Sequence, residues 1–480
     1  MDALLARPAV ASPPVAVGRS ARASAPAPRA APPAAETAPR LGELLGALSH
    51  ALDITGGQPA GHGVRTCWIA QRLGVAIGLG TTELRDLYYA TLLKDSGCSS
   101  NASRVCELFL ADDRRFKSRR RGIGLGLPGL LTFLVRNTGV DAGPAARLAA
   151  VLHAARHGEA IQRELVETRC SRGAQVARQL RFSEDVALAI QGLDEHWDGR
   201  GHPQGLAGHA IPLLSRVALL AQMVDMFHAR GGAQAAREMV ARRRARWFDP
   251  QLADAFSVLA RDPAFWTPLG AEDLAQQVLE MEPARQLQPL DDDYLDDIAA
   301  AFGKIVDAKS PFTGGHSARV AQVADQLAQR LELPAGTRRW LRRGALLHDV
   351  GKLGVSNLIL DKPGKLDPAE WAEMQRHAMH SEEILGRISA FGTLARVAGA
   401  HHERLDGSGY PRGLDARHIR LETRIITTAD VFDALTADRP YRAALPYAQA
   451  LEIMRADIGK GIDADCFVAL EATLDELIGP

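Results

Sequence analysis

The second half of this 480-residue chain concentrates side chains that bind transition metals. Histidines and aspartates recur there at seven positions, which are His316, His348, Asp349, His377, His401, His402 and Asp430. Imidazole and carboxylate groups together suit iron, manganese or zinc, whereas magnesium and calcium prefer oxygen ligands alone. Seven ligands are too many for one ion. Divided between two ions about 3.5 to 4 Å apart, with one bridging carboxylate, they would suit a hydrolase that activates water for in-line attack on phosphorus.

Two basic residues lie close to these ligands in the sequence. Lys352 follows His348 by four residues, and Arg319 follows His316 by three, which is about one turn of a helix. A cationic side chain beside such a centre can bind phosphate oxygens or donate a proton to a leaving oxygen. We therefore predict that Lys352 and Arg319 contact the substrate and take part in catalysis.

The order of these motifs resembles a known family. The segments HSAR, HDVGK, a lone His377, HHERLDGSGYP and RIITTADVFDALTADRPYR follow one another as in the HD-GYP domain of the HD phosphohydrolase superfamily, over roughly residues 295 to 470. The resemblance implies an all-helical, metal-dependent phosphodiesterase. Its expected substrate is cyclic di-GMP, and its expected product is the linear dinucleotide pGpG or, in some members, GMP.

The resemblance also implies a role for each ligand. One metal ion would be held by His316, His348, Asp349 and Asp430, and the other by His377, His401 and His402. Asp349 would bridge the two ions, which makes it a catalytic residue as well as a ligand, and Lys352 would face the phosphate. Members with three metals have a glutamate four residues before the first histidine, where this chain has Phe312. That departure favours two divalent ions, with iron or manganese expected and zinc left open.

The same resemblance points to two further contacts. The segment Gly409-Tyr410-Pro411 lies in a loop that is linked in the family to substrate access or to a protein partner. Tyr410 is therefore a candidate substrate contact, and its glycine neighbour permits backbone angles that other residues resist. Arg442, in the RPYR segment, is a candidate contact for a nucleotide phosphate.

The elements that would position these residues are predicted to be helices. Beyond an alanine- and proline-rich stretch at residues 1–40, apolar residues recur every three or four positions, as in Val320, Val323, Ala324 and Leu327. Alternating runs typical of strands are scarce. We therefore predict an all-α fold, preceded by a disordered tail at residues 1–40, whose composition cannot form a packed core.

Two stretches of the chain correspond to each other at constant spacing. His62 precedes His316 by 254 residues, and Lys94 precedes His348 by the same number. Later, the segment DGRGHPQG at 198–205 precedes DGSGYPRG at 406–413 by 208 residues. Two constant spacings indicate a duplication, and their difference predicts an insertion of 46 residues in the first copy. We predict two tandem HD-type helical bundles, at residues 41–285 and 286–480.

The first copy lacks most of the ligands. It retains His62 and Asp95, but the other positions that correspond to ligands are Lys94, Arg169, Leu193, Asp194 and Gln222. Lysine and arginine repel a divalent cation, and leucine has no donor atom. We expect this degenerate copy to bind no binuclear centre and to have a regulatory, sensory or dimerising role.

Composition limits the classes of partner. Lysine plus arginine equals aspartate plus glutamate at 57 each, so no overall field attracts nucleic acid or an anionic membrane. No run of about 18 uncharged apolar residues predicts a membrane-spanning helix. Five cysteines without a C-x-x-C pair favour a reducing compartment, and we expect a cytoplasmic protein.

These observations favour a bacterial cyclic di-GMP phosphodiesterase in second-messenger signalling. One alternative is a phosphohydrolase of another cyclic dinucleotide or nucleotide, because a metal centre specifies the bond that breaks more firmly than the base that is bound. A second alternative is a non-catalytic module that binds a nucleotide or a protein partner. A homodimer is left open by the sequence.

Overall fold

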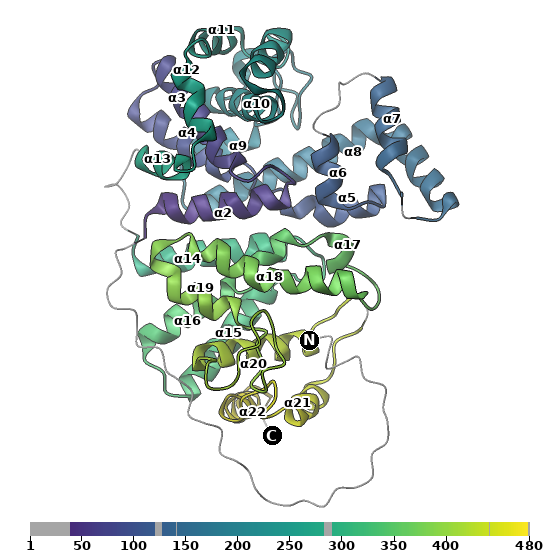
Figure 1. Ribbon diagram of the computed structural model, residues 1–480, viewed down its shortest axis with the longest axis vertical. Coiled ribbons are helices and arrows are strands. Elements are labelled where there is room, and N and C mark those ends of the chain that lie inside the picture. The colour runs from purple at the N-terminus through teal and green to yellow at the C-terminus, as the bar shows by residue number, and fades with distance from the viewer. Residues whose placement is uncertain (1–38, 121–126, 141, 283–289, 441, 479–480) are drawn as a thin grey trace, which may run out of the picture.

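The computed structural model describes residues 39–120, 127–140, 142–282, 290–440 and 442–478 (Figure 1). Within these ranges the chain forms helices, turns and a few isolated bridges but no β-strand, which confirms the all-α prediction. Nearly all of the predicted tail lies outside the described residues. So does the predicted boundary between the two copies, which falls within residues 283–289 and stays a prediction.

The α-helices of the first half precede this boundary. They are α2 (Leu41–Thr55), α3 (His62–Ala76), α4 (Thr81–Leu93), α5 (Ala102–Phe109), α6 (Asp113–Arg120), α7 (Leu127–Asn137), α8 (Pro144–Gln179), α9 (Glu184–Gln191), α10 (Leu213–Arg243), α11 (Pro250–Leu259), α12 (Pro263–Trp266) and α13 (Leu274–Glu280). In the second half they are α14 (Asp292–Asp307), α15 (His316–Arg330), α16 (Ala335–Leu347), the 3₁₀ helix η4 (Val350–Gly354), α17 (Asn357–Leu360), α18 (Pro368–Gly386), α19 (Gly392–Gly399), α20 (Leu421–Thr436), α21 (Tyr447–Ala456) and α22 (Ala464–Ile478).

Helices in the two halves begin and end at the spacings found in the sequence. The bounds of α3 and α4 recur 254 residues later as those of α15 and α16, and the bounds of α9 recur 208 residues later as those of α19. The two cis peptide bonds, His202-Pro203 and Tyr410-Pro411, follow the second spacing as well. The backbone is therefore duplicated together with the sequence pattern.

The insertion in the first copy forms an arm. It includes α6 and α7, and α8 extends far beyond the length of its counterpart α18 (Figure 1). The arm has a small hydrophobic core of its own, in which Phe116 lies between Phe109 and Phe133 with ring centroids 4.1 and 5.1 Å away. This separate core explains how the insertion folds without disturbing the main bundle.

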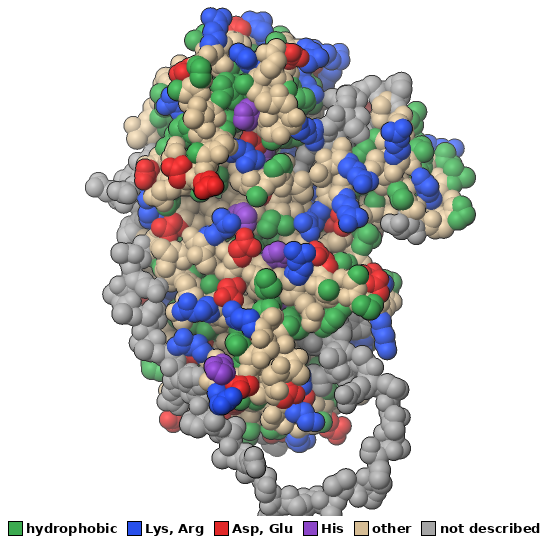
Figure 2. Space-filling view, in the orientation of Figure 1, with side chains coloured by type: hydrophobic (Ala, Val, Ile, Leu, Met, Phe, Trp, Pro, Cys, Tyr) green, Lys and Arg blue, Asp and Glu red, His purple; other side chains and the backbone are tan. Residues whose placement is uncertain are grey.

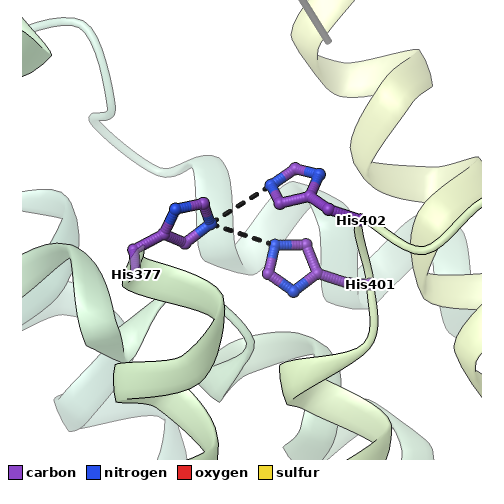
Figure 3. Close-up of side chains that lie close together, drawn as sticks. All are labelled: His377, His401 and His402. Atoms are coloured by element: carbon purple, nitrogen blue, oxygen red, sulfur yellow. Dashed lines mark hydrogen bonds between the residues drawn. The ribbon is translucent and has the colours of Figure 1, made fainter. Parts of the chain in front are cut away.

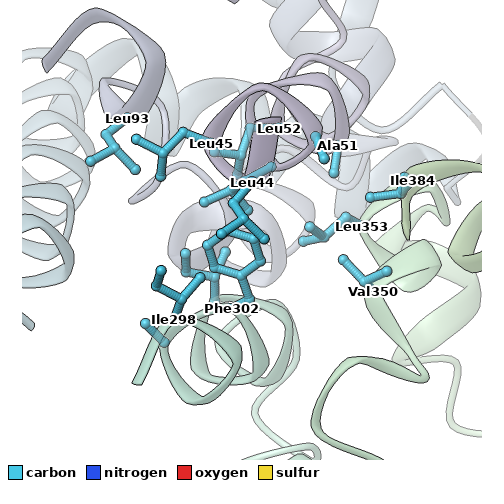
Figure 4. Packing of buried hydrophobic residues seen from close by; sticks show 14 of the residues in the cluster. Leu44, Leu45, Ala51, Leu52, Leu93, Ile298, Phe302, Val350, Leu353 and Ile384 are labelled. Carbon is cyan, nitrogen blue, oxygen red and sulfur yellow. The ribbon is translucent and has the colours of Figure 1, made fainter. Parts of the chain in front are cut away.

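The main hydrophobic core runs through both halves without a break (Figure 4). Helix α2 of the first copy lies along the junction, next to α14, η4 and α18 of the second copy (Figure 1). Its side chains Leu44, Ala51 and Leu52 pack in one cluster with Phe302 and Leu353. Burial of this kind contributes about 25 cal/mol per Å² of apolar surface, so the two copies stabilise each other.

The surface agrees with the balanced charge of the sequence. Acidic and basic side chains are interspersed over the face shown in Figure 2. In the described part of the chain, no helix combines the length and the apolar character that crossing a membrane requires.

Candidate metal centre

Five α-helices and the 3₁₀ helix η4 bring the predicted ligands together. His316 is the first residue of α15, because Gly315 before it takes a left-handed conformation with φ of 73° that allows the chain to turn into the helix. His348 ends α16, and Asp349 follows it directly at the start of η4. The remaining ligands lie in the middle of α18, just after α19 and within α20; they are His377, His401, His402 and Asp430.

Close packing of η4 against α18 brings the two halves of the site together. A Cβ atom at Gly351 would lie 2.0 Å from the carbonyl oxygen of His377, so only glycine fits at this crossing. The backbone N–H of Gly351 also donates to Ser381 Oγ on α18, at 2.9 Å. Asp349 and His377 are thereby held on adjoining elements.

The carboxylate of Asp349 lies at the centre of the cluster. Its Oδ2 lies 3.3 Å from Nε2 of both His316 and His348. Its Oδ1 lies 3.4 Å from Nε2 of His377 and 3.7 Å from Nε2 of His401. One oxygen therefore faces each group of imidazoles, which is the arrangement that a bridging carboxylate between two ions requires.

Each group offers enough ligand atoms for one ion. His316, His348 and Asp430 form one set whose ligand atoms all lie within 4.8 Å of one another, and Asp430 Oδ1 is 3.4 Å from His316 Nε2. The other set is His377, His401 and His402 (Figure 3). There, Nε2 of His377 lies 3.4 Å from Nε2 of His401 and 3.1 Å from that of His402.

Hydrogen bonds fix the orientation of four of the imidazole rings. Nδ1 of His316 bonds to Asp433 Oδ2 at 2.7 Å. In the other three, Nδ1 bonds to a backbone carbonyl three residues earlier, at 2.6 to 2.7 Å; these are His348, His377 and His401. With a proton on Nδ1, Nε2 keeps its lone pair and points into the cluster, as it does in metal-binding histidines.

Burial and charge favour a bound cation. Burial lowers the pKa of His377 to about 4 and that of His401 to about 3, so these rings are neutral at pH 7, the form that binds metal. Burial acts on His316 in the same direction, but the carboxylates of Asp349, Asp433 and Asp430 overcome it and raise its pKa to about 9. The excess of negative charge around His316 would be neutralised by a metal ion.

Unpaired buried atoms provide a direct test of whether metal fits. Nε2 of His316, Nε2 of His348 and Oδ1 of Asp349 are buried and have no hydrogen-bond partner among the described residues. Leaving such atoms unpaired costs about 1 to 3 kcal/mol each. All three point into the cluster, so a metal ion would satisfy them together. The side chains of the cluster therefore suit a bound metal ion.

A cavity of about 900 Å³ opens over the cluster. Its wall includes His316, Asp349, His377, His402 and Asp430, together with the predicted contacts Lys352, Tyr410 and Arg442. Lys352 forms an ion pair with Asp349 Oδ2, and the Tyr410 ring lies 4.8 Å from that of His402. The structure therefore brings these side chains to one site.

The structure places Arg319 and Arg442 differently relative to the cavity. Arg319 is not among the described residues that line the cavity, because its guanidinium bonds to Asp433, with Nη2 3.1 Å from Oδ2, and to the carbonyl of Gly314 at 2.8 Å. Arg442 reaches the cavity wall, but it donates to the carbonyls of Ala434 and Leu435 at the end of α20, at 2.8 and 3.0 Å. The Nη donors of Arg442 therefore bond to the end of α20, although the residue lines the cavity.

Asp433 is the functional residue that the sequence analysis missed. It receives both His316 Nδ1 and the Arg319 guanidinium, and it is almost fully buried. Its counterpart in the first copy is Asp225, 208 residues earlier, which holds His62 and Arg65 in the same way, with His62 Nδ1 at 2.6 Å. The presence of an aspartate in both copies at the known spacing is a signal that could have identified it.

In the described chain, every group of side chains close enough to hold a metal ion lies in the second copy. At the corresponding place in the first copy there is a smaller cavity of about 360 Å³, which Asp194, His202 and Gln222 help to line. These residues correspond to His402, Tyr410 and Asp430 by the spacing of 208. The first copy has thus kept a hollow at this position without its set of ligands.

The second copy is a helical bundle that directs five imidazoles and two carboxylates into one buried cluster beneath an open cavity. This arrangement is typical of helical domains that bind metal ions. The family model for the HD domain matches residues 137–252 and 301–466, which lie in both copies. The chain belongs to the HD domain family, as a member of the HD-GYP type, which confirms the resemblance found in the sequence.

Individual proteins that this chain resembles belong to the same family of phosphodiesterases. The 3'3'-cGAMP-specific phosphodiesterase 3 of Vibrio cholerae is 52% identical over 437 residues, which cover 91% of this chain and 95% of the relative. A crystal structure described as a cyclic GMP-AMP specific phosphodiesterase of V. cholerae matches with a TM-score of 0.63 and 48% identity over 91% of this chain and 97% of that one. The cyclic di-GMP phosphodiesterase response regulator RpfG of Xanthomonas campestris is 41% identical over 176 residues, which cover 35% of this chain and 46% of the relative.

Proposed function

We propose that the protein hydrolyses cyclic dinucleotides, with 3'3'-cGAMP as its preferred substrate, at the cluster in the second copy. The observation that carries this proposal is the convergence of unpaired buried ligand atoms on Asp349, beneath a cavity large enough for a dinucleotide. Residues 286–480 would perform the chemistry, and residues 41–285 would support or regulate it.

Two divalent ions fit the ligand sets. His316, His348, Asp349 and Asp430 would hold one, and His377, His401 and His402 the other, with Asp349 shared between them. Iron or manganese suits these ligands, and so does zinc. When bound, the ions would lower the pKa of water toward about 7 and neutralise the charge that develops on phosphorus.

The side chains of this chain would perform the remaining tasks. Lys352, whose ammonium already lies beside Asp349, is placed to hold a phosphate oxygen or to donate a proton to the leaving O3'. The rings of Tyr410 and Trp371 lie at the cavity wall with centroids 5.9 Å apart, where they can contact a base. Lys362, Lys365 and Arg439 add positive charge to the same wall, which suits a substrate with two phosphates.

The preference for 3'3'-cGAMP differs from the substrate that the sequence analysis expected. The relative named for 3'3'-cGAMP matches nearly the whole chain, including the degenerate copy and the arm, at 52% identity. The relative named for cyclic di-GMP matches little more than a third of the chain. Cyclic di-GMP is therefore the second candidate, since its two phosphodiester bonds present the same chemistry to the same ligands.

The test is a substrate panel. Protein purified without oxygen and supplied with Fe²⁺ or Mn²⁺ is incubated with 3'3'-cGAMP, cyclic di-GMP and cyclic di-AMP, beside the Asp349→Ala variant. Addition of one water across one P–O3' bond should give a linear dinucleotide with a 5'-phosphate and a free 3'-hydroxyl, fastest from 3'3'-cGAMP. Faster turnover of cyclic di-GMP would reverse the order of the two substrates, and no hydrolysis of any of them would refute the proposal.

A further inference from the structure

The backbone that follows Asp349 is anchored from the first copy. The helix η4 carries Lys352, and its last two carbonyl groups, those of Leu353 and Gly354, receive side-chain donors. Thr55 at the end of α2 donates through Oγ1 to the Leu353 carbonyl at 3.0 Å, and it shares this hydrogen with the carbonyl of Ala51 at 3.1 Å. Arg114 on α6 donates through Nη1 to the Gly354 carbonyl. Both donors belong to the first copy, about 240 and 300 residues away in the sequence.

Arg114 connects three elements at once. Its Nε donates to the carbonyl of Ile54 on α2 at 3.2 Å, while Nη1 bonds to η4. The same Nη1 lies 3.8 Å from Oε1 of Glu373, four residues before His377 on α18. A planar guanidinium with several donors suits such a junction, because each donor is fixed relative to the others. One side chain thus links the first copy to both elements that carry the two halves of the metal cluster.

The surroundings of this junction are buried and charged. Asp113, next to Arg114, is fully buried, accepts from the backbone N–H of Asn357 at 3.4 Å and pairs with Lys117 at 3.3 Å. Lys309 of the second copy is also buried, lines the catalytic cavity and donates to the same Leu353 carbonyl at 3.0 Å. Buried charges are costly unless they are paired, so this network holds its parts in one arrangement.

Apolar packing supports the same contact. In Figure 4, Ala51 and Leu52 of α2 lie beside Val350 and Leu353 of η4, with Ile384 of α18 nearby. A Cβ atom added at Gly354 would lie 3.5 Å from the side chain of Ile54. The face of η4 opposite the cavity is therefore covered by the first copy.

We propose that Arg114 and Thr55 are positioning residues for the catalytic site of the second copy. This inference rests on the proposed function. By fixing the Leu353 and Gly354 carbonyls, they set the backbone of η4 and hence the place of Lys352 and Asp349 relative to the bound phosphodiester. The degenerate copy then completes the active site from behind and does more than carry a regulatory signal.

The expected effect is on kcat, because neither residue lines the cavity. A displacement of about 1 Å in a catalytic group can reduce the rate by about 100-fold. We expect Arg114→Ala to lower kcat at least about 10-fold, with KM changed less than about twofold. Arg114→Lys should recover part of the loss, because an ammonium can replace one of the donors. Thr55→Val should cause a smaller loss, because Lys309 still bonds to the Leu353 carbonyl.

The experiment uses the full chain loaded with Mn²⁺ and the exposed neighbour Arg115→Ala as the matched control. Thermal unfolding checks that each variant is folded, and hydrogen exchange of residues 350–357 measures the anchoring of η4 without reference to activity. Faster exchange there in Arg114→Ala than in Arg115→Ala, together with the lower kcat, would support the inference. Equal exchange and equal kcat in the two variants would overturn it. If the unmutated protein hydrolyses no cyclic dinucleotide, the proposed function fails. Hydrogen exchange in the two variants then still tests the anchoring, because faster exchange in Arg114→Ala would show that Arg114 anchors η4 and equal exchange would show that it does not.

Discussion

The two copies differ most in what occupies the centre of each bundle. In the second copy, the centre is the Asp349 carboxylate, and Nε2 of both His316 and His348 beside it has no hydrogen-bond partner among the described residues. In the first copy, the Lys94 side chain is buried at the corresponding place, where Nζ lies 3.0 Å from His62 Nε2 and pairs with Asp95. The ammonium group of the chain itself thus lies where His316 and Asp349 of the second copy would hold a metal ion.

The second half of the centre differs in the same way. Arg169 takes the position of His377 and forms an ion pair with Asp194, which takes the position of His402. The surrounding frame is nevertheless the same, since Asp225 holds His62 and Arg65 as Asp433 holds His316 and Arg319. The comparison teaches that the first copy places the positive charges of a lysine and an arginine at positions where the second copy has side chains that could bind metal.

The most severe way to test this comparison is to remove the central carboxylate from each copy. Asp349→Ala should reduce turnover at least about 1000-fold, because the loss of a shared ligand removes several kcal/mol of transition-state stabilisation. Asp95→Ala should leave kcat of the folded protein unchanged while lowering its melting temperature, because Lys94 loses its partner. Rates are measured by chromatography of the product. An equal loss of turnover in the two variants would contradict the division between the copies.

Removing the internal cation tests the claim that it replaces metal. Lys94→Met should destabilise the protein by about 3 kcal/mol, because it leaves Asp95, whose side chain is only 13% exposed, without its ammonium partner. The measurement is the melting temperature, which should fall by about 3 °C, because the two halves share one core and unfold as one large unit. The exposed Lys304→Met is the control, since its loss leaves no buried charge unpaired. A melting temperature as high as that of the control would show that Lys94 contributes nothing to the centre.

The sequence predicted the parts of the site that depend on residue type and spacing. It identified the all-helical class and the duplication from constant spacings, and it identified the side chains of the cluster because imidazole and carboxylate groups gather in the second half in the order of a known family. It could not predict the partner of Arg319, because whether a guanidinium faces the cavity or Asp433 depends on the packing of α15 against α20. Spacing along one helix restricts a side chain to a face and does not choose between its neighbours.

The contact between the two copies could not be predicted from the sequence either. Arg114 belongs to a basic run that is most simply explained as a solvated surface, and Asp113 beside it is a typical first residue of a helix. The contact of Arg114 with η4 and that of Asp113 with α17 follow from the docking of α2 and α6 on the second copy, about 240 residues away. No periodicity within one segment reports such a contact.

Asp433 and Asp225 offer a milder test, because they orient a ligand and do not bind the metal directly. Asp433→Asn should lower metal affinity or turnover by about 10- to 100-fold, since the amide no longer fixes the protonated Nδ1 of His316 as strongly. Asp225→Asn is the matched variant in the first copy and should leave both quantities within about twofold of the unmutated protein. Metal content is determined by elemental analysis after dialysis against graded chelator. A larger loss in Asp225→Asn would mean that the first copy controls the metal site through its own centre.

The smallest expected effect concerns the pH dependence of stability. It involves Asp53 and Asp307, which accept hydrogen bonds from the first turns of α3 and α15. Burial raises the pKa of Asp53 from 3.8 to about 7, although the backbone N–H of Gly63 donates to it at 3.1 Å. Because the folded-state pKa is the higher one, its stabilising contribution is complete below about pH 4 and is lost as the pH rises through 7. Asp53→Asn should therefore leave stability unchanged near pH 4 and raise it by on the order of 1 kcal/mol at pH 8, where the uncharged amide avoids the desolvation cost.

The counterpart in the second copy sharpens this last prediction. Burial also raises the pKa of Asp307, but its carboxylate accepts from the Ser317 hydroxyl at 2.7 Å, where the first copy has Gly63. Asp307→Asn should gain less at pH 8, because the amide is a weaker acceptor for that hydroxyl. Denaturant unfolding at pH 4, 6 and 8 measures both variants. If Asp53→Asn raises the free energy of unfolding by the same amount at every pH, the charge of Asp53 is not the cause of the increase. If Asp53→Asn and Asp307→Asn raise it equally, the Ser317 hydroxyl has no role in the difference between the copies.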